Sequence, residues 1–286
     1  MNTVLIKNAQ IVNEGTCIAR DVLIKGTFIA EIGNNLKAPS ENISVIDANG
    51  SYLLPGLIDD QVHFREPGLT HKATIATESR AAVAGGITSF IEMPNTIPQA
   101  TTQKLLQDKF DIAAKTSYAN YSFMFGGAND NLDELLNTDP QKVAAINLFL
   151  GSSTGNMLVD NEEVLKKIFS STKMLIAVHC EDESTIRKNL KEAIEKYGDD
   201  IPIHLHPKIR SAEACYLSSS KAIALAKETG ARLHIFHLST AEEMNLFRND
   251  IPLAEKKITA EVCIHHLTFT DEDYKEKELL SNGIQQ

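Results

Sequence analysis

The feature that most constrains the fold is an alternation of short apolar segments with amphipathic segments, which begins near Leu53. Apolar segments of strand length recur, and stretches with helical periodicity separate most of them. Strands that are joined through a helix usually pair in parallel, by right-handed crossovers. The alternation therefore predicts an α/β fold, either a (β/α) barrel or a doubly wound sheet.

Polar residues at the strand ends favour the barrel. The predicted strands, in chain order, are LLPGLID, ITSFIEMP, NYSFMFG, VAAINLFLG, MLIAVHC, RLHIFHL and ITAEVC. His63, Asn95, His179 and His237 lie at or just beyond the C-terminal ends of such strands, where barrel enzymes collect functional side chains. The sequence has no GxGxxG or GxxxxGK[ST] motif after a strand, which argues against a nucleotide-binding doubly wound sheet. We therefore expect a (β/α)8-type TIM barrel over residues 55–286 that lacks its last βα unit.

The first part of the chain has a different pattern. Residues 1–54 contain short β-segments that are separated by Gly, Asn and Pro turn residues. This pattern predicts a small N-terminal β side domain, with the barrel following from residue 55.

Composition and charge limit the kinds of molecule that this protein is expected to bind. A hydrophobic content of 43% over 286 residues is enough for a sizeable core. The formal net charge of -10, with no basic run, argues against nucleic acid or an anionic membrane as the main partner. The four cysteines lie far apart, and the chain has neither a leader pattern nor an apolar run of about 20 residues. We expect a cytoplasmic enzyme that acts on a small molecule.

Three histidines suggest a metal site. His179 and His237 each close a predicted strand, and His63 closes an earlier one. Gln61 shares a strand face with His63, so a histidine there would complete a chelating His-x-His pair. Imidazole nitrogens suit zinc and its neighbours. The alternative for each histidine alone is a structural core residue, but three at equivalent strand ends predict a metal site.

Arg65 and Asn95 suggest an anion site beside it. Arg65 lies one strand step beyond His63, and its guanidinium can form two charge-assisted hydrogen bonds with a carboxylate. The amide of Asn95 can supply another donor. The alternative for Arg65 is a surface ion pair with Glu66 or Asp60.

Other candidates carry less weight. His204 and His206 precede a proline in a predicted loop, which favours a structural role or a place at the substrate's edge. Neighbouring His265 and His266 point to opposite faces of an extended chain, so at most one reaches the barrel mouth. The Gly- and Ser-rich segment 151–156 is predicted to be a loop rather than a phosphate site.

The ordered motifs resemble a known family. PGLIDDQVHFREPG, AAVAGGITSFIEMPNT, INLFLG, AVHCEDE and IFHLST occur in the order and spacing of class I dihydroorotases of the amidohydrolase superfamily, over essentially the whole chain. REPG and MPNT distinguish this family from hydantoinases and allantoinases. The resemblance implies a metal-dependent (β/α)8 barrel whose N-terminal β-segments join a C-terminal piece in a side domain. It also implies reversible hydrolysis of dihydroorotate to N-carbamoyl-aspartate, in pyrimidine biosynthesis.

The resemblance assigns roles to five residues. His63, His179 and His237 match the family's metal ligands, with zinc as the expected ion. Arg65 and Asn95 match the residues that bind the carboxylate of the substrate.

The sequence departs from the family at two ligand positions. Gln61 stands where the family has its first histidine, and Asn147 stands where a carboxylated lysine or an aspartate bridges two metals. Both replacements are neutral amides, which supply no charge to hold two cations together. We therefore expect one zinc ion rather than two.

A third departure concerns the catalytic acid. The family has an aspartate followed by histidine after the eighth strand, and this chain has no Asp-His pair, so no catalytic residue is assigned and weak activity is expected. Three functions stay open: a dihydroorotase-type hydrolase, a non-catalytic homologue that assembles with aspartate transcarbamoylase, and a hydrolase of another cyclic amide such as a hydantoin. A homodimer is an alternative assembly.

Overall fold

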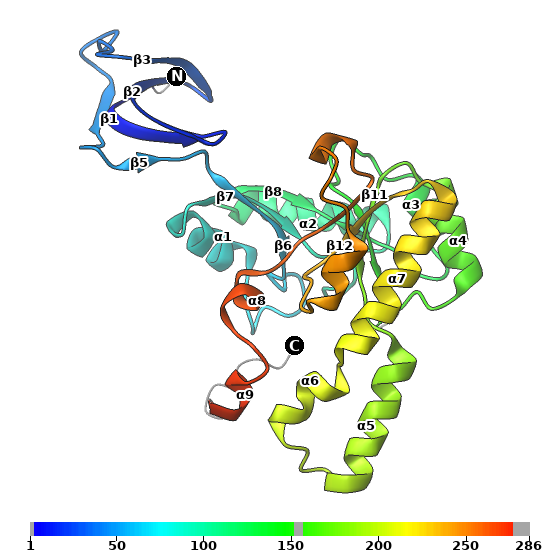
Figure 1. Cartoon of the computed structure of the whole chain (residues 1–286). Coiled ribbons are helices and arrows are strands. Elements are labelled where there is room, and N and C mark those ends of the chain that lie inside the picture. Colours follow the sequence, from blue (N-terminus) through cyan, green and yellow to red (C-terminus); the bar gives the residue numbers. More distant parts are fainter. Residues whose placement is uncertain (1–2, 152–156, 277–286) are drawn as a thin grey trace. The chain divides into compact units, whose positions relative to one another are not determined.

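The chain forms two compact units, Met1–Leu57 and Ile58–Gln286. The structure, a computed structural model, describes residues 3–151 and 157–276 (Figure 1). Most of the Gly- and Ser-rich segment that was predicted to be a loop, residues 152–156, lies outside this description.

The first unit is a five-stranded sheet with strand order β3-β2-β1-β4, in which β5 also pairs with β1. Strands β1 and β2 form a long antiparallel hairpin, while β4 and β5 run parallel to β1. Both residues of the hairpin turn, Glu14 and Gly15, have positive φ, as the turn type that matches strand twist requires. The strands are β1 (Thr3–Asn13), β2 (Thr16–Lys25), β3 (Phe28–Gly33), β4 (Ser44–Asp47) and β5 (Tyr52–Leu53).

The second unit contains the seven predicted strands in chain order. Two sheets, β6-β7-β8 and β9-β10-β11-β12-β13, follow that order, and every neighbouring pair from β9 to β13 is parallel. Met124 alone separates β8 from β9, so these two form one interrupted strand. The strands are β6 (Leu57–Val62), β7 (Ile87–Glu92), β8 (Asn120–Phe123), β9 (Phe125–Gly126), β10 (Ile146–Phe149), β11 (Leu175–His179), β12 (Arg232–Ile235) and β13 (Ile258–Ala260).

Helices follow most of these strands and flank them (Figure 1). Side-chain caps fix where the helices begin: Thr102, Asn161 and Ser211 each accept a backbone N–H from the first turn of α2, α4 and α7. The α-helices are α1 (Ile75–Ala84), α2 (Gln103–Thr116), α3 (Leu132–Leu136), α4 (Glu162–Ser171), α5 (Glu183–Tyr197), α6 (His206–Ile209), α7 (Ala212–Thr229), α8 (Ile264–Thr268) and α9 (Asp273–Glu276). Three 3-10 turns lie between them: η1 (Ile203–Leu205), η2 (Glu242–Leu246) and η3 (Leu253–Glu255).

The main core lies between the strands and helices α2, α4 and α7. Alternate residues of β10 and β11, such as Leu148 and Val178, pack there with Ile168 and Phe169 of α4. Burying each such side chain stabilises the fold by roughly 1.5–3 kcal/mol. A smaller cluster that includes Ala177 lies among the intervening residues. The strands are therefore buried on both faces, as a parallel sheet requires.

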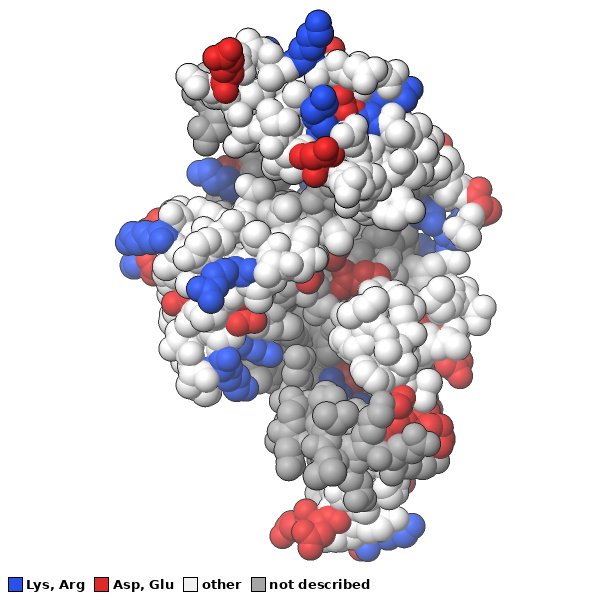
Figure 2. Space-filling model, turned by 90° about the vertical axis from the view of Figure 1, so that its left-hand side faces the viewer, with Lys and Arg blue, Asp and Glu red and all other residues white. Residues whose placement is uncertain are grey.

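The surface carries both signs of charge. Figure 2 shows lysine and arginine side chains scattered among acidic ones on the face in view, without a continuous basic patch among the residues drawn in colour or white. No helix within residues 3–151 and 157–276 has the length and apolar character needed to cross a membrane.

Candidate functional site

His63 and Asn95 meet beyond the ends of β6 and β7. The contact joins His63 Nδ1 to Asn95 Oδ1 at 2.9 Å. Because an amide oxygen only accepts, Nδ1 carries the proton and Nε2 of the neutral ring keeps its lone pair. Burial, and then the charge of Arg65, lower the pKa of His63 to about 4, so the ring is neutral at pH 7.

Arg65 is held through its backbone by a buried ion pair. Its φ of 66° lies in the left-handed region, which side-chain-bearing residues rarely adopt. The backbone N–H of Arg65 donates to the Glu92 carboxylate, and Glu92 pairs with Lys109 of α2. The side chains of Glu92 and Lys109 are each 1% exposed. The arginine backbone is therefore fixed from inside the protein.

The guanidinium of Arg65 is half-buried, and burial lowers its pKa. Among the described residues it makes no ion pair, so the predicted surface pair with Glu66 or Asp60 is not formed. Glu66 instead accepts the backbone N–H of Ile75 at 2.8 Å, at the start of α1. The donors of Arg65 are available to an anionic ligand.

His179 lies at the centre of a polar chain at the end of β11. Its Nε2 lies 2.8 Å from Glu181 Oε2, and Arg210 binds the same carboxylate with two nitrogens. Burial raises the pKa of Glu181, but the hydrogen bonds from His179 and Arg210 outweigh it and hold the pKa well below its usual range. Glu181 is therefore ionised and holds a proton on Nε2 of His179, so that Nδ1 of the same ring points away from Glu181.

Nδ1 of His179 faces His237. The distance from His179 Nδ1 to His237 Nε2 is 2.9 Å. Burial, and then the neighbouring His179, lower the pKa of His237 to about 3, so this ring is also neutral at pH 7. Neutral imidazole is the form that binds a metal ion.

The two amides at the degenerate ligand positions have different surroundings. Asn147 is buried on β10; its Nδ2 donates to Ala177 O at 3.3 Å, and its Oδ1 has no hydrogen-bond partner among the described residues. Gln61 Oε1 accepts from Cys263 Sγ at 3.7 Å. Neither position supplies a negative charge.

The donor atoms of these residues are of the kind that bind a divalent ion of the zinc class. His179 Nδ1 and His237 Nε2 lie 2.9 Å apart, and the buried Asn147 Oδ1 has no hydrogen-bond partner among the described residues. A second ion would need a bridging anion, which Gln61 and Asn147 cannot supply. His63 does not lie within 4.8 Å of both other histidines. In the described chain, only two sets of three possible ligands lie that close together, and they are Cys263, His265 and His266, and Asp60, His234 and Glu261.

Sequence analysis missed the residues that support the site. Glu181 follows His179 by two positions on an extended strand end, so the shared face could have indicated their contact. Glu92, Lys109 and Arg210 come from segments that are distant in sequence, and no local pattern predicts their contacts. His204 and His206, predicted to lie in a loop, instead lie in short helical turns.

Comparison with solved structures supports the fold. The chain superposes on the L-hydantoinase (dihydropyrimidinase) from Arthrobacter aurescens with a TM-score of 0.88 at 25% identity, covering 96% of this chain and 61% of that one. A D-hydantoinase structure superposes with a TM-score of 0.82 at 26% identity, covering 96% of this chain and 60% of that chain.

Comparison of sequences shows the family. Curated proteins named dihydroorotase from Methanosarcina acetivorans and Lactococcus lactis are 34% and 35% identical over 285 and 284 residues, which is 96% and 94% of this chain. The chain spans 59% and 62% of the length of these two relatives. The family model described as dihydro-orotase-like matches residues 50–243. The chain therefore belongs to the dihydroorotase-like family.

Proposed function

We propose that this chain carries the active-site part of a dihydroorotase-type cyclic amide hydrolase, which interconverts dihydroorotate and N-carbamoyl-aspartate. The observation that carries the proposal is Arg65: its backbone is fixed by the buried Glu92, and its guanidinium forms no ion pair among the described residues, with the charge of Glu92 acting on it from a greater distance. Dihydroorotate offers a carboxylate that such a guanidinium can bind through two hydrogen bonds. The similarity to proteins named dihydroorotase supports the same substrate.

Each of the site residues either binds the substrate or holds a metal-binding histidine in position. Arg65 binds the substrate carboxylate and Asn95 adds an amide contact while it orients His63. Glu181, clamped by Arg210, orients His179. One zinc ion, held by His179, His237 and His63, would lower the pKa of a water molecule and polarise the ring amide carbonyl.

We also propose the architecture in which this site works. The seven strands in chain order, parallel from β9 to β13, support a (β/α)8-type barrel over residues 55–286 without its last βα unit. The sheet formed by β1 to β5 supports a side domain over residues 1–54. Small-molecule chemistry in a soluble cytoplasmic protein agrees with the net charge of -10.

Two alternatives make different predictions. A non-catalytic homologue that assembles with aspartate transcarbamoylase is favoured by the neutral amides Gln61 and Asn147. A hydantoin hydrolase is favoured by the structural similarity to hydantoinases. The second alternative would leave the half-buried charge of Arg65 without a partner, because a simple hydantoin lacks a carboxylate.

The test compares dihydroorotate with dihydrouracil, which has the same ring without the carboxylate, using zinc-loaded protein. We expect selective hydrolysis of dihydroorotate. Replacing Arg65 with Met should lower kcat/KM for dihydroorotate roughly 10- to 100-fold, because a hydrogen bond to a charged group contributes about 1.5–3 kcal/mol. Arg80→Met, on an exposed position of α1, is the matched control and should leave both rates unchanged.

Each alternative has its own outcome in this experiment. Faster hydrolysis of dihydrouracil, insensitive to Arg65→Met, would replace the proposal with the hydantoinase-type activity. No turnover of either ring, together with co-purification of aspartate transcarbamoylase, would replace it with the assembly function.

A further inference from the structure

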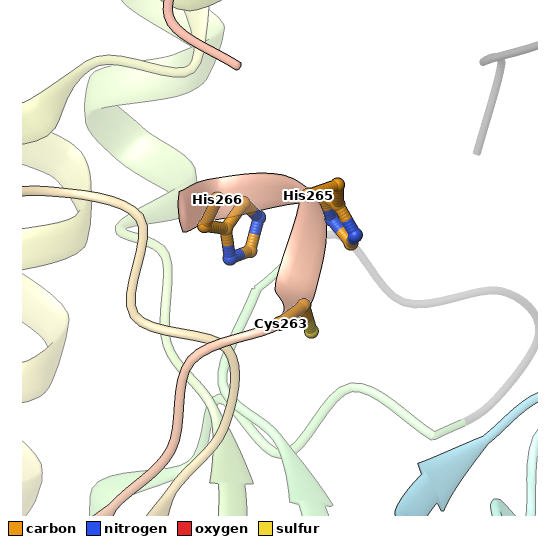
Figure 3. A group of neighbouring side chains, drawn as sticks. All are labelled: Cys263, His265 and His266. Atoms are coloured by element: carbon orange, nitrogen blue, oxygen red, sulfur yellow. The ribbon is translucent and has the colours of Figure 1, made fainter. Parts of the chain in front are cut away.

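A cluster of three metal-binding side chains lies outside the proposed zinc ligands. Cys263, His265 and His266 sit at the start of the short helix α8, after β13, and Figure 3 shows all three on this single turn of chain. One ligand atom from each lies within 4.8 Å of the other two. The expectation that the two histidines point to opposite faces of an extended chain is wrong, because the helical turn brings their ring centroids to 4.2 Å.

One nitrogen of this cluster lacks a partner. Nδ1 of His266 is buried, yet it has no hydrogen-bond partner among the described residues. Buried polar atoms without a partner are uncommon in native proteins, and an unfilled ligand position is one explanation for them. The orphan nitrogen belongs to the same residue that completes the three-ligand group, so two independent observations point to this place.

The electrostatic surroundings favour a cation. The carboxylates of Glu261, Asp59 and Asp60 act electrostatically on the Cys263 sulfur. Negative groups that disfavour a free thiolate favour a divalent cation at the same point. A metal ion that binds the sulfur displaces its proton, as it does at other thiolate sites.

The spacing of the ligands is close to that of a bound ion. Zn–S and Zn–N bonds of about 2.3 and 2.1 Å place two tetrahedral ligands about 3.4–3.7 Å apart. Separations of up to 4.8 Å therefore need to close by at most about 1.1–1.4 Å. The side chain of His265 is exposed and can rotate to close this gap.

We propose that Cys263, His265 and His266 form a second metal site, which binds one thiophilic transition-metal ion of the zinc class with water as the fourth ligand. One thiolate and two imidazoles are a ligand set that such ions prefer over magnesium or calcium. The site uses none of His63, His179 and His237, so it does not depend on the proposed hydrolytic function.

Cobalt(II) is the probe that distinguishes the two sites. A thiolate bound to Co²⁺ gives an intense charge-transfer band in the near ultraviolet, which histidine ligands alone do not give. Titration of the reduced full chain with Co²⁺ should produce this band, and added Zn²⁺ should remove it. Cys263→Ser should abolish the band, and His265→Asn, at an exposed position, should weaken Co²⁺ binding at this site at least tenfold.

Two matched variants control for other sites. Cys215→Ser, at another partly buried cysteine, and His63→Asn, at the proposed zinc site, should both keep the band. Far-ultraviolet circular dichroism of each variant checks that it is folded, and the exposed His265 provides the test if Cys263→Ser fails to fold. A wild-type chain that binds Co²⁺ without the band, a band that survives in Cys263→Ser, or a band lost in His63→Asn would each overturn the proposal.

Discussion

Replacing Lys109 with Met should destabilise the second unit far more than its position on a helix would suggest. Lys109 and Glu92 form an ion pair in which both side chains are 1% exposed, and Lys109 Nζ also donates to Met93 O at 2.7 Å. The substitution removes the cation that opposes the effect of burial, which already raises the pKa of Glu92 to about 7, and leaves the Glu92 carboxyl group buried without its partner. Breaking a buried ion pair from one side costs about 3–5 kcal/mol. Methionine is nearly as long as lysine, so little of this cost comes from a cavity.

The same helix provides the control. Lys104 pairs with Asp108 at 3.0 Å in α2, but their side chains are 82% and 46% exposed. An exposed pair of this kind contributes about 0.3–0.5 kcal/mol, so Lys104→Met should barely change stability. The double variant Glu92→Gln with Lys109→Met removes both charges and should recover part of the loss, because a neutral amide replaces the buried carboxylate.

Urea unfolding, followed by circular dichroism, measures these differences. The midpoint of Lys109→Met should fall while the slope with urea stays close to that of the wild type, which shows that stability and not the unfolded state has changed. If Lys109→Met and Lys104→Met differed by less than about 1 kcal/mol, or if the double variant were less stable than Lys109→Met, the buried charge would not be the source of the stability.

Two further predictions concern a helix cap and a buried amide. Asp182 caps α5 by accepting the N–H of Thr185 at 2.9 Å, and hydrogen bonds, the largest from Ser184, lower its pKa to about 2. Asp182→Ala should lower the free energy of unfolding by about 1 kcal/mol at pH 7. The difference between wild type and variant should be fully present above the unfolded-state pKa near 3.8 and should disappear as pH falls toward 2. Acid titration of the stability of both proteins tests this, and two curves that do not converge would show that the cap is unimportant. Asn147→Leu should change the free energy of unfolding by less than about 1 kcal/mol, because it removes a buried oxygen that has no hydrogen-bond partner among the described residues. Leu148→Ala, at the neighbouring core position, should lower it by about 2–5 kcal/mol. A loss above about 2 kcal/mol for Asn147→Leu in urea unfolding would show that the amide is hydrogen-bonded.

The order of the strands could be predicted from the sequence, because parallel βα units have strong local patterns. Each strand is a short apolar run, such as INLF in β10, and capping residues such as Asn161 mark where helices begin. Short segments near the end of the chain were less predictable. His265 and His266 were expected in an extended chain, but α8 is a helix of five residues, too short for periodicity to reveal it.

The candidate site could be predicted in part, for a related reason. His179 ends β11, and His63 and His237 lie one and two residues beyond β6 and β12, so their position follows from strand assignment alone. The contacts that fix them do not: Arg210 reaches Glu181 across a separation of 29 residues, and the partner of Lys109 lies on β7. Such pairs depend on how helices pack on the sheet, which side-chain patterns within one segment do not specify.

The arrangement of the buried charges explains how position 147 can carry a neutral amide in place of an anion without loss of the fold. The carboxylate of Glu92 is paired with Lys109, and that of Glu181 is paired with Arg210. Neither pair depends on a charge at position 147, where the neutral amide of Asn147 is buried. Replacing a bridging anion there with asparagine therefore leaves no uncompensated buried ion in either pair, and so avoids the large cost of a broken pair. Under the proposed function, the substitution would lower the number of metal ions that the site holds, while the framework that positions Arg65 and His179 is retained.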